Sequence, residues 1–301
     1  MDAREIVGVG RSRPTMEGAG VHLHRAFGFH DTGMFDPFLL LDDFRGERQE
    51  EFVAGFPWHP HRGIETITYM LEGSVEHGDS LGNKGVIRPG EVQWMTAGSG
   101  IIHQEMPKPD ANGRMGGFQL WANLPAARKM IPPRYQEFGR DDFPVAKLDG
   151  GAQAIVVCGQ LAGVEGPVNA VAVTPGFSDV TVPAGCRVAL PTPPDHNAIA
   201  YVFEGQAFLD ERRNPGAWEV RSDGYTERRT DALLDNHTLV RFGPGAEIRV
   251  ETLPDGPVRF MLMTGRPLGE SVAWGGPIVM NTREELQTAF RELEAGTFLK
   301  R

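Results

Sequence analysis

Two segments, well separated along the chain, carry the residue types of a metal centre. The first holds His59, His61 and Glu65, and the second holds His103 and Glu105. Because successive side chains of an extended strand alternate sides, the odd-numbered residues of each segment would share one face. Two facing strands could then bring three imidazoles and at least one carboxylate to a single point. Imidazole suits iron, nickel, copper and zinc, and a carboxylate adds charge and a possible base.

Short strands must position these residues. The chain has 301 residues, which suits two domains of ordinary size, and its 38 Gly and 23 Pro punctuate many short apolar runs. The runs between residues 52 and 124 follow one another with turns and no helical pattern between them. This spacing is typical of antiparallel hairpins closed into a small barrel. We therefore predict an all-β protein built from two such barrels.

Charge and composition exclude several classes of function. The formal net charge is −10 and the sequence pI is about 5.4, which disfavours direct nucleic-acid binding. The first residues lack an apolar signal core, and no run is long enough for a membrane span. Cys158 and Cys186 show no metal-type spacing, as expected of a reduced compartment. We expect a cytoplasmic protein without membrane contact.

The second half repeats parts of the first. The run Tyr-Met-Leu-Glu-Gly at 69–73 recurs as Tyr-Val-Phe-Glu-Gly at 201–205, and the turn at 88–91 recurs loosely at 243–246. The two offsets differ, which predicts an insertion at 211–231. Under these offsets the five candidate ligands fall on non-ligating residues, namely Pro191, Pro193, Asn197, Val258 and Phe260. The second copy is thus predicted to lack metal ligands, and His196 and His237 are read as ordinary polar positions.

The chain ends in a predicted helix over about 282–296. Thr282 and Glu285 fit a capping box, and apolar residues follow at helical spacing before Gly296. The predicted division is a metal-binding domain at 1–135, a linker at 136–150, and a second domain at 151–301 that carries this helix.

Five segments of the sequence resemble the pirin family, whose members are two-domain proteins of the cupin superfamily. The segments run through most of the chain, and the two that contain histidines are the most specific. They are Asp36-Pro37-Phe38-Leu39-Leu40-Leu41-Asp42, His59-Pro60-His61-Arg62-Gly63-Ile64-Glu65-Thr66, Pro89-Gly90-Glu91-Val92-Gln93-Trp94-Met95-Thr96-Ala97-Gly98, Gly100-Ile101-Ile102-His103-Gln104-Glu105-Met106-Pro107 and Gly276-Pro277-Ile278-Val279-Met280-Asn281-Thr282. The resemblance implies two tandem cupin barrels.

The resemblance also implies which carboxylate binds metal. In many cupins the residue placed like Glu65 is a ligand, whereas in pirins the carboxylate comes from the segment of Glu105. It therefore implies a metal held by His59, His61, His103 and Glu105. Glu65 is then expected to orient a ligating histidine or Arg62 from behind.

Three apolar side chains near the histidines are candidates for a substrate pocket, namely Phe56, Trp58 and Met106. Some pirins resemble quercetinases, which open the central ring of a flavonol with O₂. By this resemblance Glu105 would take the flavonol hydroxyl proton while the metal binds the resulting oxyanion. The expected cofactor is one divalent transition metal, Fe(II) first, with Ni, Co, Mn, Cu or Zn as alternatives.

A second function stays open beside this metal-dependent dioxygenase. Other pirins resemble metal- or redox-dependent regulatory proteins that bind transcription regulators or metabolic enzymes. The acidic balance of this chain disfavours DNA contact but allows protein contact. The expected partners are a flavonol-like aromatic molecule and O₂, or a protein, and the chain itself is expected to be a monomer.

Overall fold

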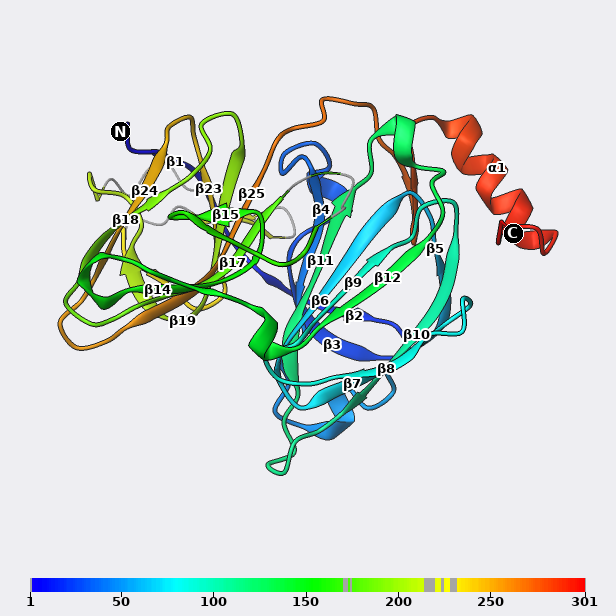
Figure 1. Cartoon of the computed structure of the whole chain (residues 1–301), viewed down its shortest axis with the longest axis horizontal. Coiled ribbons are helices and arrows are strands. Elements are labelled where there is room, and N and C mark those ends of the chain that lie inside the picture. Colours follow the sequence, from blue (N-terminus) through cyan, green and yellow to red (C-terminus); the bar gives the residue numbers. More distant parts are fainter. Residues whose placement is uncertain are drawn as a thin grey trace. The chain divides into compact units, whose positions relative to one another are not determined.

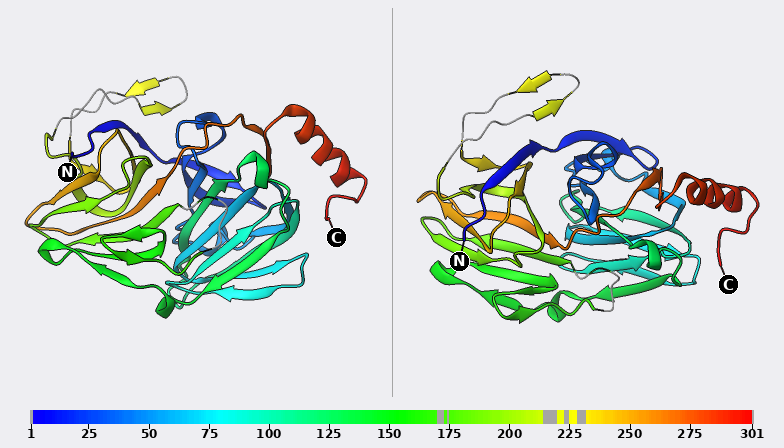
Figure 2. Two further views of the ribbon diagram at one scale, coloured as in Figure 1. Left: turned by 45° about the horizontal axis from the view of Figure 1, so that its top comes forward. Right: turned by 90° about the horizontal axis from the view of Figure 1, so that it is seen from above.

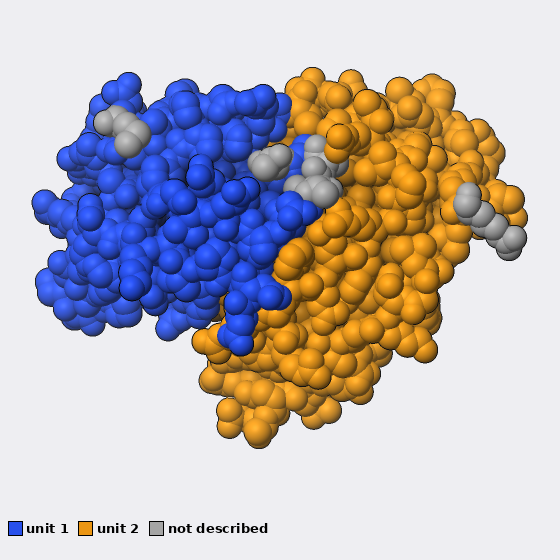
Figure 3. Space-filling view, viewed as in Figure 1, with its two compact units in different colours: residues 1–13, 141–267 blue, residues 14–140, 268–301 orange. Residues whose placement is uncertain are grey.

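The computed structural model describes residues 2–169, 173, 175–213, 220–222, 225–227 and 232–300. These residues are almost entirely strands and turns, with one α-helix among them. They divide into two compact units (Figure 3). Unit 1 comprises residues 1–13 and 141–267, and unit 2 comprises residues 14–140 and 268–301.

Unit 2 contains two facing antiparallel sheets and a small hairpin. Seven strands form one sheet in the order β12-β9-β6-β11-β4-β3-β2, and four form the other in the order β5-β10-β7-β8. The hairpin is β26-β27. The strands are β2 (Arg13–Glu17), β3 (Val21–Phe27), β4 (Phe38–Asp43), β5 (Phe56–His61), β6 (Ile64–Glu72), β7 (Ser74–Asp79), β8 (Lys84–Ile87), β9 (Val92–Thr96), β10 (Ile101–Lys108), β11 (Gly116–Asn123), β12 (Arg134–Phe138), β26 (Ala273–Gly275) and β27 (Ile278–Met280).

Unit 1 is a single ten-stranded antiparallel arrangement with two short hairpins. Its main path is β1-β23-β19-β25-β17-β14-β13, with β18, β22 and β24 attached to it. The strands are β1 (Ile6–Arg11), β13 (Val145–Lys147), β14 (Gln153–Cys158), β15 (Gln160–Leu161), β16 (Val164–Glu165), β17 (Gly176–Val182), β18 (Arg187–Pro191), β19 (Asn197–Phe208), β20 (Val220–Ser222), β21 (Tyr225–Glu227), β22 (Leu234–Asp235), β23 (Thr238–Phe242), β24 (Glu247–Thr252) and β25 (Val258–Gly265).

The two units share one strand plan. In unit 2, β6 lies between β9 and β11, and in unit 1, β19 lies between β23 and β25. Tyr69 opposes Phe118 on β11, and Tyr201 opposes Met261 on β25. Both repeats end on a glycine with positive φ, Gly73 and Gly205. The repeated run in the sequence therefore marks equivalent strands, and two antiparallel cupin barrels are confirmed.

The second predicted offset is wrong. The turn at 88–91 leads into β9, whereas the turn at 243–246 leads into β24. Strand β24 pairs with β18, and the equivalent pair in unit 2 is β10 with β5. The counterpart of β10 is therefore β24 rather than β25, and the position opposite Pro191 is Glu247. The register error arose because a Pro-Gly turn is common between strands of any kind.

The domain boundaries differ from the predicted ones. The segment at 136–150, predicted as a linker, contains the end of β12, which pairs with β9, and β13, which pairs with β14. At the start of the chain β1 pairs with β23 of unit 1, and at its end residues 268–301 belong to unit 2. In Figures 1 and 2 the red helix α1 (Arg283–Glu294) accordingly lies beside the strands of unit 2.

Helix α1 begins as the sequence predicts. Thr282 accepts a hydrogen bond from the Glu285 backbone N–H at 3.2 Å, and the Glu285 carboxylate accepts one from the Thr282 backbone N–H at 3.0 Å. Ala289 of the helix packs with Ile278, Met280 and Phe298 in a small apolar cluster. The C-terminal helix is confirmed, but it covers the hairpin of unit 2.

The predicted insertion at 211–231 lies mostly outside the described residues, apart from the backbone of the hairpin β20-β21. Cys158 and Cys186 are not joined by a disulfide. Among the residues that the structure describes, α1 is too short and too polar to cross a membrane, and no other helix reaches such a length.

Candidate metal centre

Three histidines converge between the two sheets of unit 2. His59 and His61 lie on β5, and His103 lies on β10 directly opposite His59 in the ladder. One ring nitrogen from each lies within 4.8 Å of those of the other two. The alternation of side chains along β5 places His59 and His61 on one face, as the sequence predicts. Three imidazoles at this separation can hold a divalent transition-metal ion.

Backbone carbonyls hold two of the rings in a defined tautomer. Nδ1 of His59 lies 2.8 Å from the carbonyl oxygen of Pro57, and Nδ1 of His61 lies 3.1 Å from that of Pro277. A carbonyl only accepts, so each Nδ1 must carry the proton, and each Nε2 keeps its lone pair. This is the second-layer hydrogen bond by which proteins orient histidine ligands of metals.

The third ring has no such support. His103 is 1% exposed, and neither of its ring nitrogens has a hydrogen-bond partner among the described residues. Burial lowers the pKa of His103 well below its ordinary value and lowers the pKa of His61 to about 3. The rings are therefore neutral, with lone pairs available for ligation. An unsatisfied buried imidazole costs free energy that a bound metal would offset, so the donor set fits the ion.

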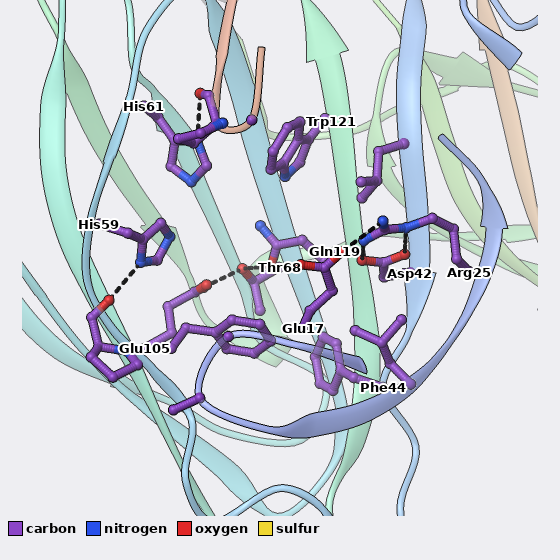
Figure 4. Close-up of a pocket in the computed structure, with 18 of the residues that line it drawn as sticks. Glu17, Arg25, Asp42, Phe44, His59, His61, Thr68, Glu105, Gln119 and Trp121 are labelled. Carbon is purple, nitrogen blue, oxygen red and sulfur yellow. Dashed lines mark hydrogen bonds and ion pairs between the residues drawn. The ribbon is translucent and has the colours of Figure 1, made fainter. Parts of the chain in front are cut away.

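Glu105 lies beside the cluster but outside the set of atoms within 4.8 Å. Its carboxylate oxygen Oε1 accepts a hydrogen bond from the Thr68 hydroxyl at 2.9 Å, as Figure 4 shows. Burial raises the pKa of Glu105 to about 7. A carboxyl group with this pKa can accept or release a proton near neutrality. Its role as a metal ligand stays a prediction.

Glu65 is separated from the histidines by a break in the strand. Gly63, with φ of 78°, lies in the turn that follows β5, and Glu65 is the second residue of β6, which belongs to the other sheet. A side chain at Gly63 would meet the Val279 carbonyl oxygen at 1.9 Å, so only glycine fits this turn. The fully buried Glu65 accepts a hydrogen bond from the Thr96 hydroxyl at 2.7 Å. Its expected action on a histidine or on Arg62 stays a prediction.

Arg62 connects the site to the end of the chain. Its guanidinium donates to the carbonyl oxygens of Ser99 and Phe298, each at 2.7 Å, and pairs with Glu292 of α1 at 2.8 Å. The guanidinium also lies over the Phe298 ring, 4.2 Å from its centroid. Arg62 thus fastens the C-terminal residues to the strand that carries His59 and His61.

A cavity of about 780 Å³ opens beside the histidines, wholly within unit 2. Phe56, His59, His61 and Glu105 line it. Trp58 and Met106, which are also predicted to line a substrate pocket, are not among the described residues that line this cavity, so the prediction is wrong for these two. On β5 the side chains alternate, so Trp58 points away from its neighbour His59 and is 55% exposed. Phe56 reaches the cavity because the ladder shifts register between His103 and Glu105.

The sequence interpretation missed most of the cavity wall. Leu40, Trp121 and Trp274 line it, each from a different strand. It also missed His77 of β7, which lies opposite Glu105, with its ring centroid 5.4 Å from that of His103. The spacing of His77 and Asp79 on one strand, which repeats the pattern of His59 and His61, was the available signal.

Comparisons with known proteins agree with this fold. The chain matches the family described as Pirin over residues 20–122 and the Pirin C-terminal cupin domain over residues 177–299. It is 44% identical to a pirin-like protein of Caulobacter vibrioides, over 99% of this chain and all of the relative. It is 38% identical to a Pseudomonas aeruginosa protein provisionally named quercetin 2,3-dioxygenase, over 97% of each chain.

A solved structure shows a similar fold over nearly the whole chain. The crystal structure described as quercetin 2,3-dioxygenase from Acinetobacter baumannii superposes with a TM-score of 0.83 at 28% identity, over 98% of each chain. The matches to both family models, and the 44% identity to the Caulobacter relative over nearly its full length, show that the chain belongs to the pirin family.

Proposed function

We propose that this pirin is a metal-dependent dioxygenase that opens the central ring of a flavonol-like aromatic substrate with O₂. The observation that carries the proposal is the position of the three-histidine cluster, of which His59 and His61 face a cavity of about 780 Å³ with aromatic walls. Ligand pockets of this size are typical of small-molecule sites. Two full-length similarities to proteins named quercetin 2,3-dioxygenase support the choice of reaction.

The metal would be held by the histidines, with Glu105 as the predicted fourth ligand. When bound, a divalent iron, nickel, cobalt, manganese or copper ion would supply Lewis acidity toward the substrate oxyanion and a route for O₂ chemistry. Fe(II) is the first candidate. Because Nδ1 of His59 and Nδ1 of His61 bond to backbone carbonyls, Nε2 is the atom of each ring that is left to bind the ion.

Glu105 is the proposed proton acceptor. The flavonol hydroxyl must lose its proton for the oxygen to bind as an anion. In the metal-free protein burial raises the pKa of Glu105 to about 7, so this carboxylate is a stronger base than an exposed one. The Thr68 hydroxyl bonds to Glu105 Oε1 and so fixes the direction of the carboxyl group.

Aromatic side chains would hold the flat substrate. The ring of Trp121 lies 5.0 Å from that of His61 and 5.9 Å from that of Trp274, measured between centroids. Such surfaces stack with planar aromatic rings and exclude water from the reacting carbon atoms.

The test is oxygen-dependent loss of quercetin by metal-reconstituted protein. Protein stripped of metal and reloaded with Fe, Ni, Co, Mn or Cu is incubated with quercetin in air and under argon. We expect loss of the flavonol absorbance in air alone, and a much slower loss with the Glu105→Gln variant. Equal rates in air and under argon for all five metals would refute the proposal.

The regulatory alternative is less well supported. It predicts a closed interior and a surface that changes with the metal, whereas unit 2 contains a large cavity next to the histidines. Affinity capture before and after chelation tests it. Partners that are retained by metal-loaded protein and lost from the His59→Ala variant would favour regulation.

A further inference from the structure

A row of polar side chains crosses the sheet that forms one wall of the cavity. Thr68 of β6 opposes Gln119 of β11, Gln119 opposes Asp42 of β4, and Asp42 opposes Arg25 of β3. Directly opposed residues of neighbouring strands lie on the same face of a sheet. All four line the cavity, and Figure 4 shows them in sequence from Glu105 toward Arg25.

The far end of this row is charged. The Arg25 guanidinium bonds both oxygens of Asp42, at 2.8 and 2.7 Å, and reaches Glu17 at 2.7 Å. Two carboxylates face one guanidinium there, which leaves a net charge of −1. Carboxylate oxygens have more lone pairs than Arg25 can satisfy, so this end of the cavity is rich in acceptors.

Apolar side chains flank the row on both sides. Trp121 and Leu40 lie two residues along their strands from Gln119 and Asp42, and Phe44 lies two residues beyond Asp42 on the other side. These three also line the cavity. A flat ring lying on this wall would therefore meet apolar surface over its faces and hydrogen-bond acceptors at one edge.

Unit 1 shows that the fold does not require the row. The matching positions there, found from the same strand pairing, are apolar or small, namely Ala200, Leu262, Ser178 and Val156. Three of these belong to the apolar core of unit 1. A largely buried ion pair is seldom more stabilising than apolar residues of similar volume. The row in unit 2 is therefore not explained by stability alone.

We propose that Glu17, Arg25, Asp42 and Gln119 form a distal subsite that selects aromatic ligands bearing hydroxyl groups at the end remote from the metal, and that rejects ligands with a carboxylate there. The assignment rests on the proposed function, because that function places the reacting ring at the histidines. The hydroxyl groups donate to the free lone pairs of the two carboxylates. An anionic group would instead meet the net negative charge.

The test measures binding rather than turnover. Metal-loaded protein is titrated calorimetrically under argon with quercetin, with 3-hydroxyflavone, which lacks the remote hydroxyls, and with 3-hydroxyflavone carrying a carboxylate on its phenyl ring. We expect quercetin to bind about tenfold more tightly than 3-hydroxyflavone, the effect of one or two good hydrogen bonds. The carboxylated compound should bind at least about tenfold more weakly than 3-hydroxyflavone.

Two variants separate the subsite from the rest of the cavity. Glu17→Gln removes the net charge at a half-exposed side chain, and Gln119→Leu copies the residue of unit 1. The first should restore most of the binding of the carboxylated ligand, and the second should reduce the preference for quercetin severalfold. Glu76→Gln is the matched control, since Glu76 is an exposed acid outside the described lining of the cavity.

Equal affinities for the three ligands in the unmodified protein would overturn the proposal. So would preferences that neither variant changes more than the control, or the absence of measurable binding. Failure of the proposed reaction gives a different result: no oxygen-dependent turnover with any metal, while the ranking of the three ligands persists under argon.

Discussion

The paired strands β5 and β10 of unit 2 and β18 and β24 of unit 1 occupy matching places in the same fold. Where His59 opposes His103, Pro191 opposes Glu247. The Glu247 carboxylate is paired with Arg249 at 2.9 Å. His103, in contrast, has no hydrogen-bond partner for either ring nitrogen among the described residues.

The beginning of the chain also closes unit 1 in this region. The Arg4 guanidinium donates to the carbonyl oxygens of Pro193 and His196 at 2.6 and 2.9 Å, and to the Thr192 hydroxyl at 2.7 Å. In unit 1 these polar groups satisfy one another, whereas in unit 2 comparable groups are left facing a cavity. Polar atoms that are kept available at a cost in stability therefore distinguish the half of this duplicated fold that is equipped to bind a ligand.

The largest expected effect is on metal affinity, when the imidazole of His103 is removed. His103→Ala should weaken metal binding by at least about 100-fold, since a ligand is lost rather than a residue that orients one. Elemental analysis of purified protein gives the metal content. Glu247→Ala, at the matching position of unit 1, should leave the content unchanged. A full equivalent of metal in His103→Ala would show that the two units do not differ as described.

The two carboxylates of unit 2 come next. Glu105→Gln should lower the rate of flavonol loss by roughly 10²- to 10⁴-fold, the usual contribution of a general base. It should also lose far more metal than Glu65→Gln, whose carboxylate bonds Thr96 in the other sheet. Both variants are assayed for rate and for metal content. If Glu65→Gln were the more damaging, the assignment of Glu105 would be reversed.

Exchanging residues between the polar row and the core of unit 1 gives a smaller effect. Leu262→Gln places an amide in the apolar core and should lower the free energy of unfolding by about 2–3 kcal/mol. The reciprocal Gln119→Leu should cost less than about 1 kcal/mol, because an apolar residue is tolerated by this fold at that position. Denaturant midpoints report both changes. A larger loss for Gln119→Leu would mean that the row is structural.

The smallest expected effect is a pH dependence. In the metal-free protein burial raises the pKa of Glu105 to about 7, so below that pH a proton must leave before the carboxylate can bind metal. The dissociation constant should rise about tenfold per pH unit below about 7 and stay level above it. His61, whose pKa is lowered to about 3, adds no slope in this range. The slope is measured by competition with a chelator, and the Glu105→Gln variant should lack it.

The histidine cluster could be predicted from sequence because one rule, the alternation of side chains along a strand, was enough to place it. The same rule would have excluded Trp58, since the neighbour of an inward residue points outward. Glu65 is odd-numbered like the three histidines, but the turn at Gly63, which has a positive φ, separates its strand from that of His61. Odd-numbered residues share a face only within an unbroken strand.

The polar row and the division into units could not be predicted in this way. Arg25, Asp42, Thr68 and Gln119 are neighbours only through the order and register of four strands, and neither follows from local sequence. The return of residues 268–301 to unit 2 likewise depends on tertiary packing. The repeated run at 201–205 did reveal the duplication, because it includes the turn glycine that both copies need.

The bonds between Arg62 and the C-terminal segment have a consequence far from the histidine cluster. Arg62 follows His61 directly, and it holds the Phe298 carbonyl and the Glu292 carboxylate of the C-terminal segment. Any shift of β5 when the histidines close on an ion must therefore be transmitted to the last turn of α1. Metal binding should therefore slow amide hydrogen exchange in residues 292–300, far from the site. In the Arg62→Lys variant, exchange in this segment should no longer depend on metal binding.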